Sequence, residues 1–508
     1  MIYLRKGDKS HNGQITIIDE DRLCYLVKSF SKGATGLRTI SKALLQEFVS
    51  YIEQHPEVPT NEVRFKISGQ SEIDKYEYGY GATIGTMAKM VLGKEGIVRS
   101  TNNTHKFVSK PHSTISGKYQ PYLTALRTKP FMLLAGISGT GKSRIVREMA
   151  KACWKEGDEE YGKNHPRNFC MVQVKPNWHD STELMGYVSR INGEKYVVGP
   201  FLRFLAAAIK EPDVPYFLCL DEMNLAPVEQ YFAEYLSVIE SRKLTDSDTI
   251  ETDPIVPFES TDAYESLIDQ LFDTPEEREP YKTKGGKQLT IPQNLFVVGT
   301  VNMDETTFSF SRKVLDRAMT IEMNEVDLHG GLEKGSGNEI GYIGNSIIGD
   351  AAEGSDVYEG NKELCDQVLA YLEEVNTALE GTPFKIAYRT RNDFLMYAVN
   401  RKALAPDSQL WQTLDEMTSM KILSRIEGDS DRTQRVLERL KALVEEQIVA
   451  QMDNITGEAP VPPSETGEVT SLPVETGETP VPQKSISATK IDEMLKKLQS
   501  TSFTSYWA

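Results

Sequence analysis

One eight-residue segment, Gly-Ile-Ser-Gly-Thr-Gly-Lys-Ser at 136–143, constrains the fold of this 508-residue chain more than any other. It follows the apolar run 131–135 and precedes the helical pattern 143–153. Glycines allow the backbone of such a loop to turn its N–H groups inward around phosphate oxygens. The pattern predicts that Lys142 reaches the β- and γ-phosphates of a nucleotide and that the Ser143 hydroxyl ligates Mg²⁺. The predicted phosphate-binding residues of this P-loop are Gly136, Ser138, Gly139, Thr140, Gly141, Lys142 and Ser143.

A second motif stands at the end of the apolar run 216–220, where Asp221 and Glu222 follow the last apolar residue. An apolar strand ending in Asp-Glu about 75 residues after a P-loop is the Walker B pattern of nucleotide hydrolases. Its aspartate is expected to hold Mg²⁺, and its glutamate to act as the general base that polarises the attacking water. Ser143 and Asp221 are therefore the predicted metal ligands, and Glu222 is a predicted catalytic residue.

A third strand-like run, 295–301, ends at Asn302. A polar side chain at this place could orient water beside the γ-phosphate, and the alternative is an Asx-type turn with surface acids. Arginines farther along could reach the γ-phosphate of a neighbouring subunit, or could form ordinary surface ion pairs. The candidates for this role are Arg312 and Arg317, with Arg203 as a further one.

Strand-like and helical patterns alternate from about residue 118 to residue 325. Buried strands that alternate with helices indicate an α/β fold with a parallel sheet. An acidic insert rich in Thr, Pro and Glu, at 245–290, is predicted to be a surface excursion. The four apolar runs assigned to the sheet are 131–135, 169–174, 216–220 and 295–301.

The region after the sheet is predicted to be a small helical domain. Four stretches between residues 360 and 450 place apolar residues at i, i+3 and i+4, the spacing of one helix face. These stretches are 364–379, 390–399, 412–425 and 433–451.

The first 118 residues are mildly basic in an acidic protein. They hold 17 Lys and Arg against 12 Asp and Glu, whereas the whole chain has a formal net charge of −17. This asymmetry favours a module that faces DNA, although a solvated surface explains it equally well. The segment Lys-Tyr-Glu-Tyr-Gly-Tyr-Gly at 75–81 could stack on bases, or could form a strand and turn with tyrosines on one face. A polar stretch at 100–117 is predicted to end this N-terminal region.

Residues 456–485 contain a ten-residue repeat around Thr-Gly-Glu, rich in Pro, Glu and Thr. Such a segment cannot offset the entropy lost on ordering, and it is predicted to be a disordered tether. It leads to an amphipathic pattern at 491–498 and an aromatic end at 503–507. We expect this end to dock, either on the chain's own body or a ring neighbour, or on a partner.

Bulk properties exclude several classes of protein. The five cysteines are widely spaced and form no CxxC, which argues against a disulfide framework or a zinc knuckle. No apolar run approaches the ~18 residues of a membrane span, and the N-terminus lacks the apolar stretch of a signal peptide. No nuclease pattern or nucleophilic triad is visible. We expect a cytoplasmic protein with no membrane partner and no nuclease site on this chain.

Four segments carry a family resemblance. Asp-Glu-Met-Asn-Leu-Ala-Pro-Val-Glu-Gln-Tyr-Phe-Ala-Glu at 221–234 resembles the extended Walker B of McrB-type AAA+ proteins. The stretch 299–318 is similar to their signature after strand four, and Lys-Ile-Leu-Ser-Arg-Ile-Glu-Gly at 421–428 to a motif of their helical lid. Segment 186–199 is similar to a family insert before helix two, and its Asn-Gly pair is a hairpin turn on physical grounds too. The resemblance covers roughly residues 120–450.

The resemblance implies a homo-oligomer, a hexameric ring that hydrolyses GTP or ATP with Mg²⁺. It also implies a separate McrC-like nuclease subunit and an N-terminal domain, here 1–115, that recognises DNA. Two departures leave questions open. The family's Asn-Thr-Ala-Asp is here Asn302-Met-Asp304-Glu305, so either acidic residue could take the acidic role. The family's string of arginines is missing, which leaves Arg312 and Arg317 as candidates.

Two other functions stay open at this point. One is a MoxR-like chaperone ATPase that remodels a protein, and the other is a nucleotide-switched scaffold, against which intact Lys142, Asp221 and Glu222 argue. The predicted division is an N-terminal α+β domain at 1–115, an AAA+ α/β domain at 118–328, a helical lid at 329–452, a disordered linker at 453–488 and a docking helix at 489–508.

Overall fold

The structure is a computed structural model of the 508-residue chain. It describes residues 117–191, 193–245, 249–303, 310–324, 340–429, 431–452 and 484–507, together with 15–20, 24–31, 34–42, 45, 49, 87, 98–101 and 106–109. Two compact units are present: 1–116 with 245–249, and 117–244 with 250–508. The predicted tether at 456–485 lies outside the described residues except for its last two positions.

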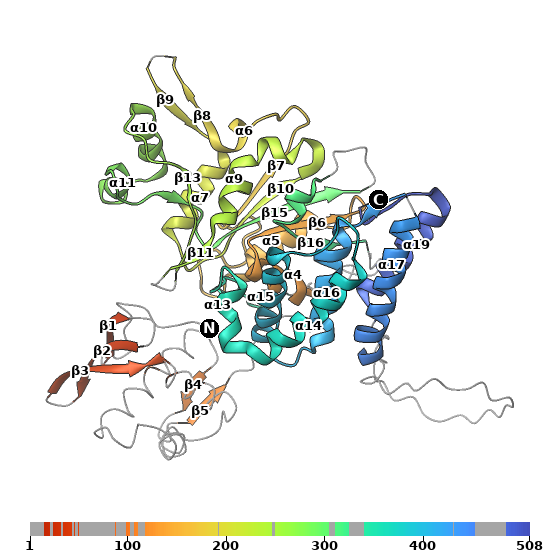
Figure 1. Ribbon diagram of the computed structural model, residues 1–508. Coiled ribbons are helices and arrows are strands. Elements are labelled where there is room, and N and C mark those ends of the chain that lie inside the picture. Colours follow the sequence, from red (N-terminus) through yellow and green to blue (C-terminus); the bar gives the residue numbers. More distant parts are fainter. Residues whose placement is uncertain are drawn as a thin grey trace. The chain divides into compact units, whose positions relative to one another are not determined.

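The first unit contains antiparallel strands. A three-stranded sheet is formed by β1 (Ile15–Glu20), β2 (Cys24–Ser31) and β3 (Ala34–Ser41), and β4 (Val98–Thr101) pairs with β5 (Lys106–Ser109) (Figure 1). Ile17 and Ile40 of the sheet are buried. The tyrosine-rich segment 75–81 lies outside the described residues, so its proposed contact with bases stays a prediction.

The second unit is built on a parallel sheet, as the alternation of apolar runs and helical patterns predicts. Its strand order is β16 (Met319–Glu322), β6 (Phe131–Gly136), β15 (Leu295–Asn302), β10 (Tyr216–Asp221) and β7 (Phe169–Gln173). All four pairings are parallel. Every residue of β6 and β15 is buried, because helices cover the sheet and such strands need apolar side chains throughout.

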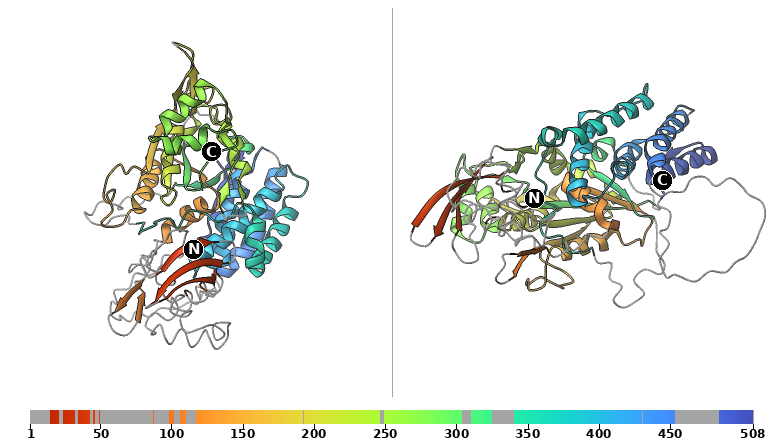
Figure 2. Two further views of the ribbon diagram at one scale, coloured as in Figure 1. Left: turned by 90° about the vertical axis from the view of Figure 1, so that its left-hand side faces the viewer. Right: turned by 90° about the horizontal axis from the view of Figure 1, so that it is seen from below.

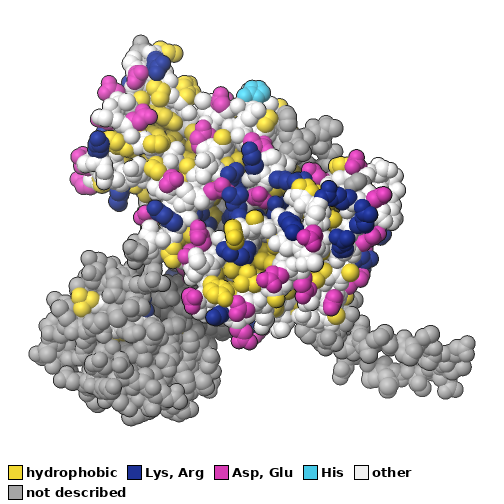
Figure 3. Space-filling model, viewed as in Figure 1, with side chains coloured by type: hydrophobic (Ala, Val, Ile, Leu, Met, Phe, Trp, Pro, Cys, Tyr) yellow, Lys and Arg dark blue, Asp and Glu magenta, His cyan; other side chains and the backbone are white. Residues whose placement is uncertain are grey.

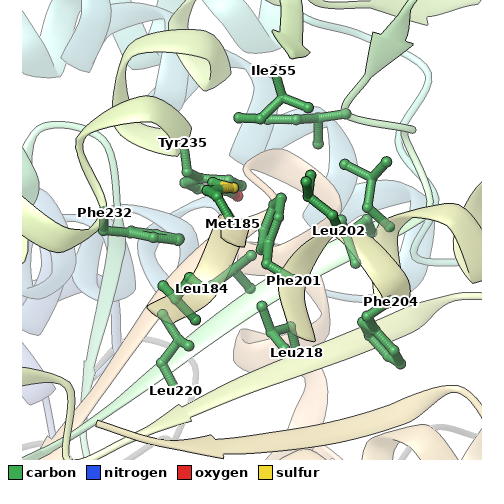
Figure 4. Close-up of a cluster of buried hydrophobic side chains, with 14 of the residues drawn as sticks. Leu184, Met185, Phe201, Leu202, Phe204, Leu218, Leu220, Phe232, Tyr235 and Ile255 are labelled. Atoms are coloured by element: carbon green, nitrogen blue, oxygen red, sulfur yellow. The ribbon is translucent and has the colours of Figure 1, made fainter. Parts of the chain in front are cut away.

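Aromatic side chains fill the core beside the sheet. Helix α7 (Pro200–Lys210) contributes Phe201, which packs edge-on against Phe232 and Tyr235 at centroid distances of 6.4 and 5.9 Å. Figure 4 shows these rings converging with Leu184, Met185 and Leu202 above the strand residues Leu218 and Leu220. Burial of such large apolar surfaces, at about 25 cal/mol per Å², is the main stabilisation of the sheet and its helices.

The acidic insert is more ordered than its composition indicates. It folds into helices α10 (Asp262–Leu271) and α11 (Pro275–Lys282), with the short strands β13 (Pro254–Val256) and β14 (Leu289–Thr290) on either side. Tyr264, Leu267, Ile268 and Leu271 of α10 are buried in the main core. The description as a surface excursion was therefore wrong for this part, because the helical spacing of these apolar residues outweighs the acidic composition.

A helical region follows the sheet, as predicted. Its main helices lie to one side of the sheet and are drawn in teal and blue in Figures 1 and 2. They are α13 (Gly354–Tyr358), α14 (Lys362–Ala378), α15 (Tyr388–Leu404), α16 (Leu410–Met417) and α17 (Asp431–Val444). We call this region, residues 340–452, the lid. A π-helical turn, η6 (Thr418–Ile422), continues α16.

A buried group of charges joins the lid to the sheet domain. Asp393 of α15, 2% exposed, lies 2.9 Å from Lys129 Nζ and 3.0 Å from Lys421 Nζ. Burial alone would raise the pKa of Asp393, but the two ammonium groups hold it below its usual range. Burial lowers the pKa of Lys129 to about 8, against the opposing effect of Asp393. Lys421 also donates to the carbonyls of residues Leu315, Asp316 and Ala318.

The C-terminal segment docks on the chain's own body. Helix α19 (Ile486–Thr501) packs against α17, and β18 (Thr504–Ser505) pairs with β17 (Glu427–Gly428). The helix starts earlier than the predicted residue 489, because the Ser485 hydroxyl accepts a capping hydrogen bond from the Ala488 amide. Within the described residues, no helix has the length and apolar character needed to cross a membrane.

Candidate nucleotide-binding site

The phosphate loop leaves the sheet at the end of β6 and enters helix α5 (Lys142–Ala152). Gly139 and Gly141 both have φ of +86°, a left-handed conformation that glycine adopts without steric cost. A Cβ on Gly136 would lie 2.4 Å from the Met323 carbonyl oxygen and 2.9 Å from Asn324 Oδ1. Position 136 therefore tolerates no side chain, and the loop starts in close contact with the chain that follows β16.

Lys142, the first residue of α5, is 6% exposed and points back along the loop. Its Nζ lies 2.9 Å from the Gly136 carbonyl oxygen and 2.7 Å from the Ile137 carbonyl oxygen. The ammonium group is thus held inside the curve of the loop, at the amino-terminal end of a helix that favours anions.

Asp221, at the carboxyl end of β10, meets two hydroxyl groups. Its Oδ1 accepts hydrogen bonds from Ser143 Oγ at 2.5 Å and from Thr300 Oγ1 at 2.8 Å. The sheet order explains this meeting, because β15 lies between β6 and β10 and its polar end adjoins both neighbours. Ser143 and Asp221 are expected here from the sequence, whereas Thr300 is not. Its position two residues before Asn302, on the same face of the strand, is the signal that could have identified it.

Glu222 has an unusual backbone. Its φ of +53° and ψ of +49° are left-handed, and among the described residues only Ser502 is another non-glycine with positive φ. Such a conformation costs a non-glycine residue about 1–2 kcal/mol. The Glu222 amide donates to Thr300 Oγ1 at 2.9 Å, so one hydroxyl fixes both Asp221 and the bend at Glu222.

Asn302 completes the group at the end of β15. Its Nδ2 donates to Glu222 Oε1 at 3.3 Å, and in the sheet register it lies beside Gly136 of β6. Asn224 Nδ2 donates to the Asn302 carbonyl oxygen at 3.3 Å. The described part of the chain thus brings the phosphate loop, Asp221, Glu222 and Asn302 together at one edge of the sheet.

Comparison with known protein families agrees with this arrangement. Residues 131–318 match the family model described as "AAA domain (dynein-related subfamily)". This segment is an AAA domain. Such a domain implies P-loop nucleotide hydrolysis, typically with Mg²⁺. Residues 346–503 match a second model, described as "Domain of unknown function (DUF8727)". That match extends from the lid through α19, and these two parts also pack against each other in the structure.

The resemblance to McrB-type proteins is confirmed as a distant one. The chain is 21% identical over 280 residues to the "Type IV methyl-directed restriction enzyme EcoKMcrB subunit" of Escherichia coli strain K12. The similarity covers 55% of this chain and 50% of that protein, so the chain spans about half the length of its curated relative. A solved structure of a proposed ATPase from Cytophaga hutchinsonii covers 61% of this chain and 82% of its own, with 15% identity and a TM-score of 0.34.

The oxygen ligands around the AAA-domain loop suit Mg²⁺. The Ser143 hydroxyl and the Asp221 carboxylate are hydrogen-bonded to each other, and both are hard oxygen donors. Mg²⁺ in nucleotide sites uses one or two protein oxygens and completes its shell with phosphate and water. Within the described residues there is no group of three or more His, Cys, Asp or Glu that could hold a metal ion by itself.

The candidate arginines of the AAA domain contact other groups. Arg317 Nη2 lies 2.7 Å from Glu240 Oε2, and Arg312 lies over the Phe384 ring at 4.8 Å from its centroid. Arg312 is the first residue of helix α12 (Arg312–Leu315), and Arg317 follows that helix. Arg317 also donates to the Lys313 carbonyl oxygen at 3.4 Å, and Arg312 lies 3.9 Å from Glu427. Arg203 is exposed on α7. Asp304 and Glu305 lie outside the described residues, so the acidic role discussed for them stays a prediction.

Proposed function

We propose that this chain is the nucleotide-hydrolysing motor subunit of a McrBC-like DNA restriction or anti-phage defence system. It would act as a ring together with a separate nuclease subunit, and its nucleotide would be GTP or ATP. The observation that carries the proposal is the hydrogen-bonded group at the sheet edge, where Ser143, Asp221, Thr300, Glu222 and Asn302 connect in that order.

The geometry supports hydrolysis of the β–γ phosphoanhydride bond. Lys142 would place its positive charge against the β- and γ-phosphates, and Ser143 and Asp221 would hold Mg²⁺, which neutralises phosphate charge when bound. Glu222 would accept a proton from the water whose oxygen attacks the γ-phosphorus, while the bond to the β-phosphate oxygen breaks. Asn302 would hold the carboxylate and the water in line, since its amide already donates to Glu222 Oε1.

A ring is supported by the place of the arginines. Phosphoryl transfer gains from a guanidinium near the γ-phosphate, often from a neighbouring protein. Arg317 and Arg312 make their contacts away from the hydrogen-bonded group. Arg317 contacts Glu240, and Arg312 contacts Phe384 and Glu427.

Figure 3 shows Lys and Arg side chains gathering on the face that carries α17 and the nearby end of α15. We propose that this face meets the phosphates bound by a neighbouring subunit.

The restriction role rests on the relative and on the charge of the N-terminal part. The curated relative is named a subunit of a methyl-directed restriction enzyme. In this chain residues 1–115 would be the module that recognises DNA, consistent with the excess of Lys and Arg there. The proposed division continues with the AAA domain at 118–328, a helical domain at 329–452 that contains the lid, the linker at 453–488 and the docking segment at 489–508.

The decisive experiment is a hydrolysis assay of the full chain with ATP and with GTP. It is run alone, with a McrC-like nuclease from the same source, and with methylated or unmethylated DNA. We expect nuclease-stimulated hydrolysis of one nucleotide, and Lys142→Ala as the control should abolish nucleotide binding. Equal turnover in Lys142→Ala would overturn the assignment of the loop. Hydrolysis that ignores both nuclease and DNA but rises with a client protein would favour the MoxR-like chaperone instead.

A further inference from the structure

The C-terminal helix is fixed firmly to the lid. Asp415 of α16 accepts hydrogen bonds from the hydroxyls of Ser485 and Ser487 and from the amides of Ile486 and Ser487. At the other end, Trp507 Nε1 donates to the Ser424 carbonyl oxygen at 2.9 Å. Attachment at both ends leaves little freedom for the side chains between them, so α19 can hold a side chain at a defined place on the sheet domain.

Lys490 is the residue of α19 that reaches the sheet. It is 8% exposed, and its Nζ lies 2.7 Å from Glu322 Oε1 and 4.7 Å from the centroid of the Tyr506 ring. Tyr506 is fully buried, so the ammonium group sits between an aromatic face and a carboxylate. Its other carboxylate neighbour, Glu493, is 3.5 Å away and 60% exposed, and therefore contributes less.

Glu322, the last residue of β16, connects Lys490 to Asn324. Its Oε1, which accepts from Lys490, also accepts a hydrogen bond from Asn324 Nδ2. With Nδ2 held on that side, Asn324 Oδ1 faces the phosphate loop and accepts from the Ile137 amide at 3.0 Å. Burial raises the pKa of Glu322, and Lys490 opposes that shift. The lysine thus favours the carboxylate form, which can only accept the Asn324 hydrogen bond.

Because the start of the phosphate loop is closely packed, the position of its backbone depends on these contacts. The Met323 amide donates to the Ala135 carbonyl oxygen at 2.7 Å, which ties the residue between Glu322 and Asn324 to β6. Gly136 has no room for a side chain beside Met323 and Asn324. A rotation of the Asn324 amide would therefore place a donor against the Ile137 N–H or force the loop to move.

We propose that Lys490 is a positioning residue for the phosphate loop, acting through Glu322 and Asn324 on the Ile137 amide. The C-terminal segment is then part of the nucleotide site's support, although it lies more than 340 residues after the loop. This inference rests on the proposed binding of nucleotide at that loop.

The test separates positioning from general stabilisation of α19. The variants are Lys490→Met, Lys490→Arg, Asn324→Ala and, as a matched control, Asp492→Asn. The control removes the ion pair of α19 with Lys441, also 2.7 Å long, without touching Glu322. For each full-length variant, the Kd of fluorescent ATP and GTP analogues, kcat at saturation and the Tm without nucleotide are measured.

We expect Lys490→Met to raise Kd about tenfold, the effect of losing one charge-assisted hydrogen bond. kcat should change less than about twofold because Glu222 and Asn302 are untouched. Lys490→Arg should restore Kd, and Asp492→Asn should leave it unchanged. Asn324→Ala should raise Kd at least as much as Lys490→Met does. The double variant should have the same Kd as Asn324→Ala alone.

Two results would overturn the inference. One is an unchanged Kd in Lys490→Met, and the other is an equal rise in Kd in Asp492→Asn with an equal loss in Tm, which would mean that any weakening of α19 suffices. Failure of the wild-type chain to bind either analogue would instead contradict the proposed function. The two failures are therefore distinguishable in one experiment.

Discussion

The side-chain amide of Asn302 lies 3.3 Å from the Glu222 carboxylate, although Asn302 ends β15, Glu222 follows β10 and the two residues are 80 positions apart. The contact exists because β10 and β15 are parallel neighbours whose carboxyl ends meet at one edge of the sheet. Glu222 also holds a left-handed backbone there, which places its carboxylate beside Asn302. Strain concentrated at one acidic residue is a feature typical of functional sites.

Glu222→Gln should separate binding from hydrolysis. The amide keeps the shape of the side chain but cannot accept the proton of water, so turnover should fall by about 10²–10⁴. The Kd of the nucleotide should change less than about threefold, because Lys142 and Ser143 are intact. A coupled phosphate-release assay and nucleotide titration measure both quantities. Glu251→Gln, on an exposed position of β12 (Ile250–Glu251), is the control, and retained turnover in Glu222→Gln would remove its role as general base.

Thr300→Val should lower the turnover of the same site. The change keeps the shape but removes the hydroxyl that donates to Asp221 and accepts from the Glu222 amide. Loss of two hydrogen bonds, at about 1 kcal/mol each, should lower turnover ~10- to 30-fold. Thr300→Ser, which keeps the hydroxyl, should retain most activity. If valine and serine behave alike in a steady-state assay, the hydroxyl has no part in the site.

Arg317→Ala should abolish hydrolysis with little loss of stability. Its ion pair with Glu240 is partly exposed, 21% and 24%, and pairs of this kind contribute about 0–1 kcal/mol. A guanidinium supplied to a neighbour's γ-phosphate is worth about 10³–10⁵ in turnover. Mixing Arg317→Ala with Glu222→Gln subunits should recover activity, because some interfaces then join an intact Arg317 to an intact Glu222. If mixing recovers nothing while Arg312→Ala mixtures do, Arg312 is the contributing arginine.

Asp393→Asn should loosen the joint between the lid and the sheet domain. The change leaves the ammonium groups of Lys129 and Lys421 buried without their shared carboxylate. Breaking a buried pair in this way costs about 3–5 kcal/mol, which should lower Tm by ~5–15 °C in a thermal-shift measurement. Asp269→Asn is the matched control, because its pair with Lys282 is 45% exposed on the aspartate side. A similar small shift in both variants would contradict the structural role of the joint.

Glu416 should make the lid less stable as the pH rises. Burial raises its pKa from 4.5 to about 7, although Arg401 opposes the shift. Between these two pH values the folded state binds the proton that the unfolded state has lost, so stability falls with rising pH by up to ~3 kcal/mol. The glutamine of Glu416→Gln cannot titrate. The difference in free energy of unfolding between this variant and the wild type should therefore shift in favour of the variant from pH 5 to pH 8. Hydrogen exchange of α15 and α16 amides measures the difference, and a difference that does not vary with pH would contradict this assignment.

Local patterns were sufficient for the phosphate loop and for Asp221, Glu222 and Asn302. Each of these stands at the end of an apolar run, and the ends of parallel strands must meet at one edge of a sheet. Thr300 and Asn324 could not be recognised in the same way. Each is one polar residue among many, and its importance comes from neighbours on other strands, such as Asp221 for Thr300 and the Ile137 amide for Asn324.

The sequence by itself determined that this protein has a phosphate loop, a parallel α/β sheet and a helical region after it. These features depend on glycine spacing and on apolar periodicity, which are properties of short segments. Only the tertiary structure decided that Thr300 bridges Asp221 and Glu222, that Asp393 lies between two lysines and that Lys490 reaches Glu322. Such pairings join residues far apart in the chain, and their energies arise from burial and charge that exist only after the chain has folded.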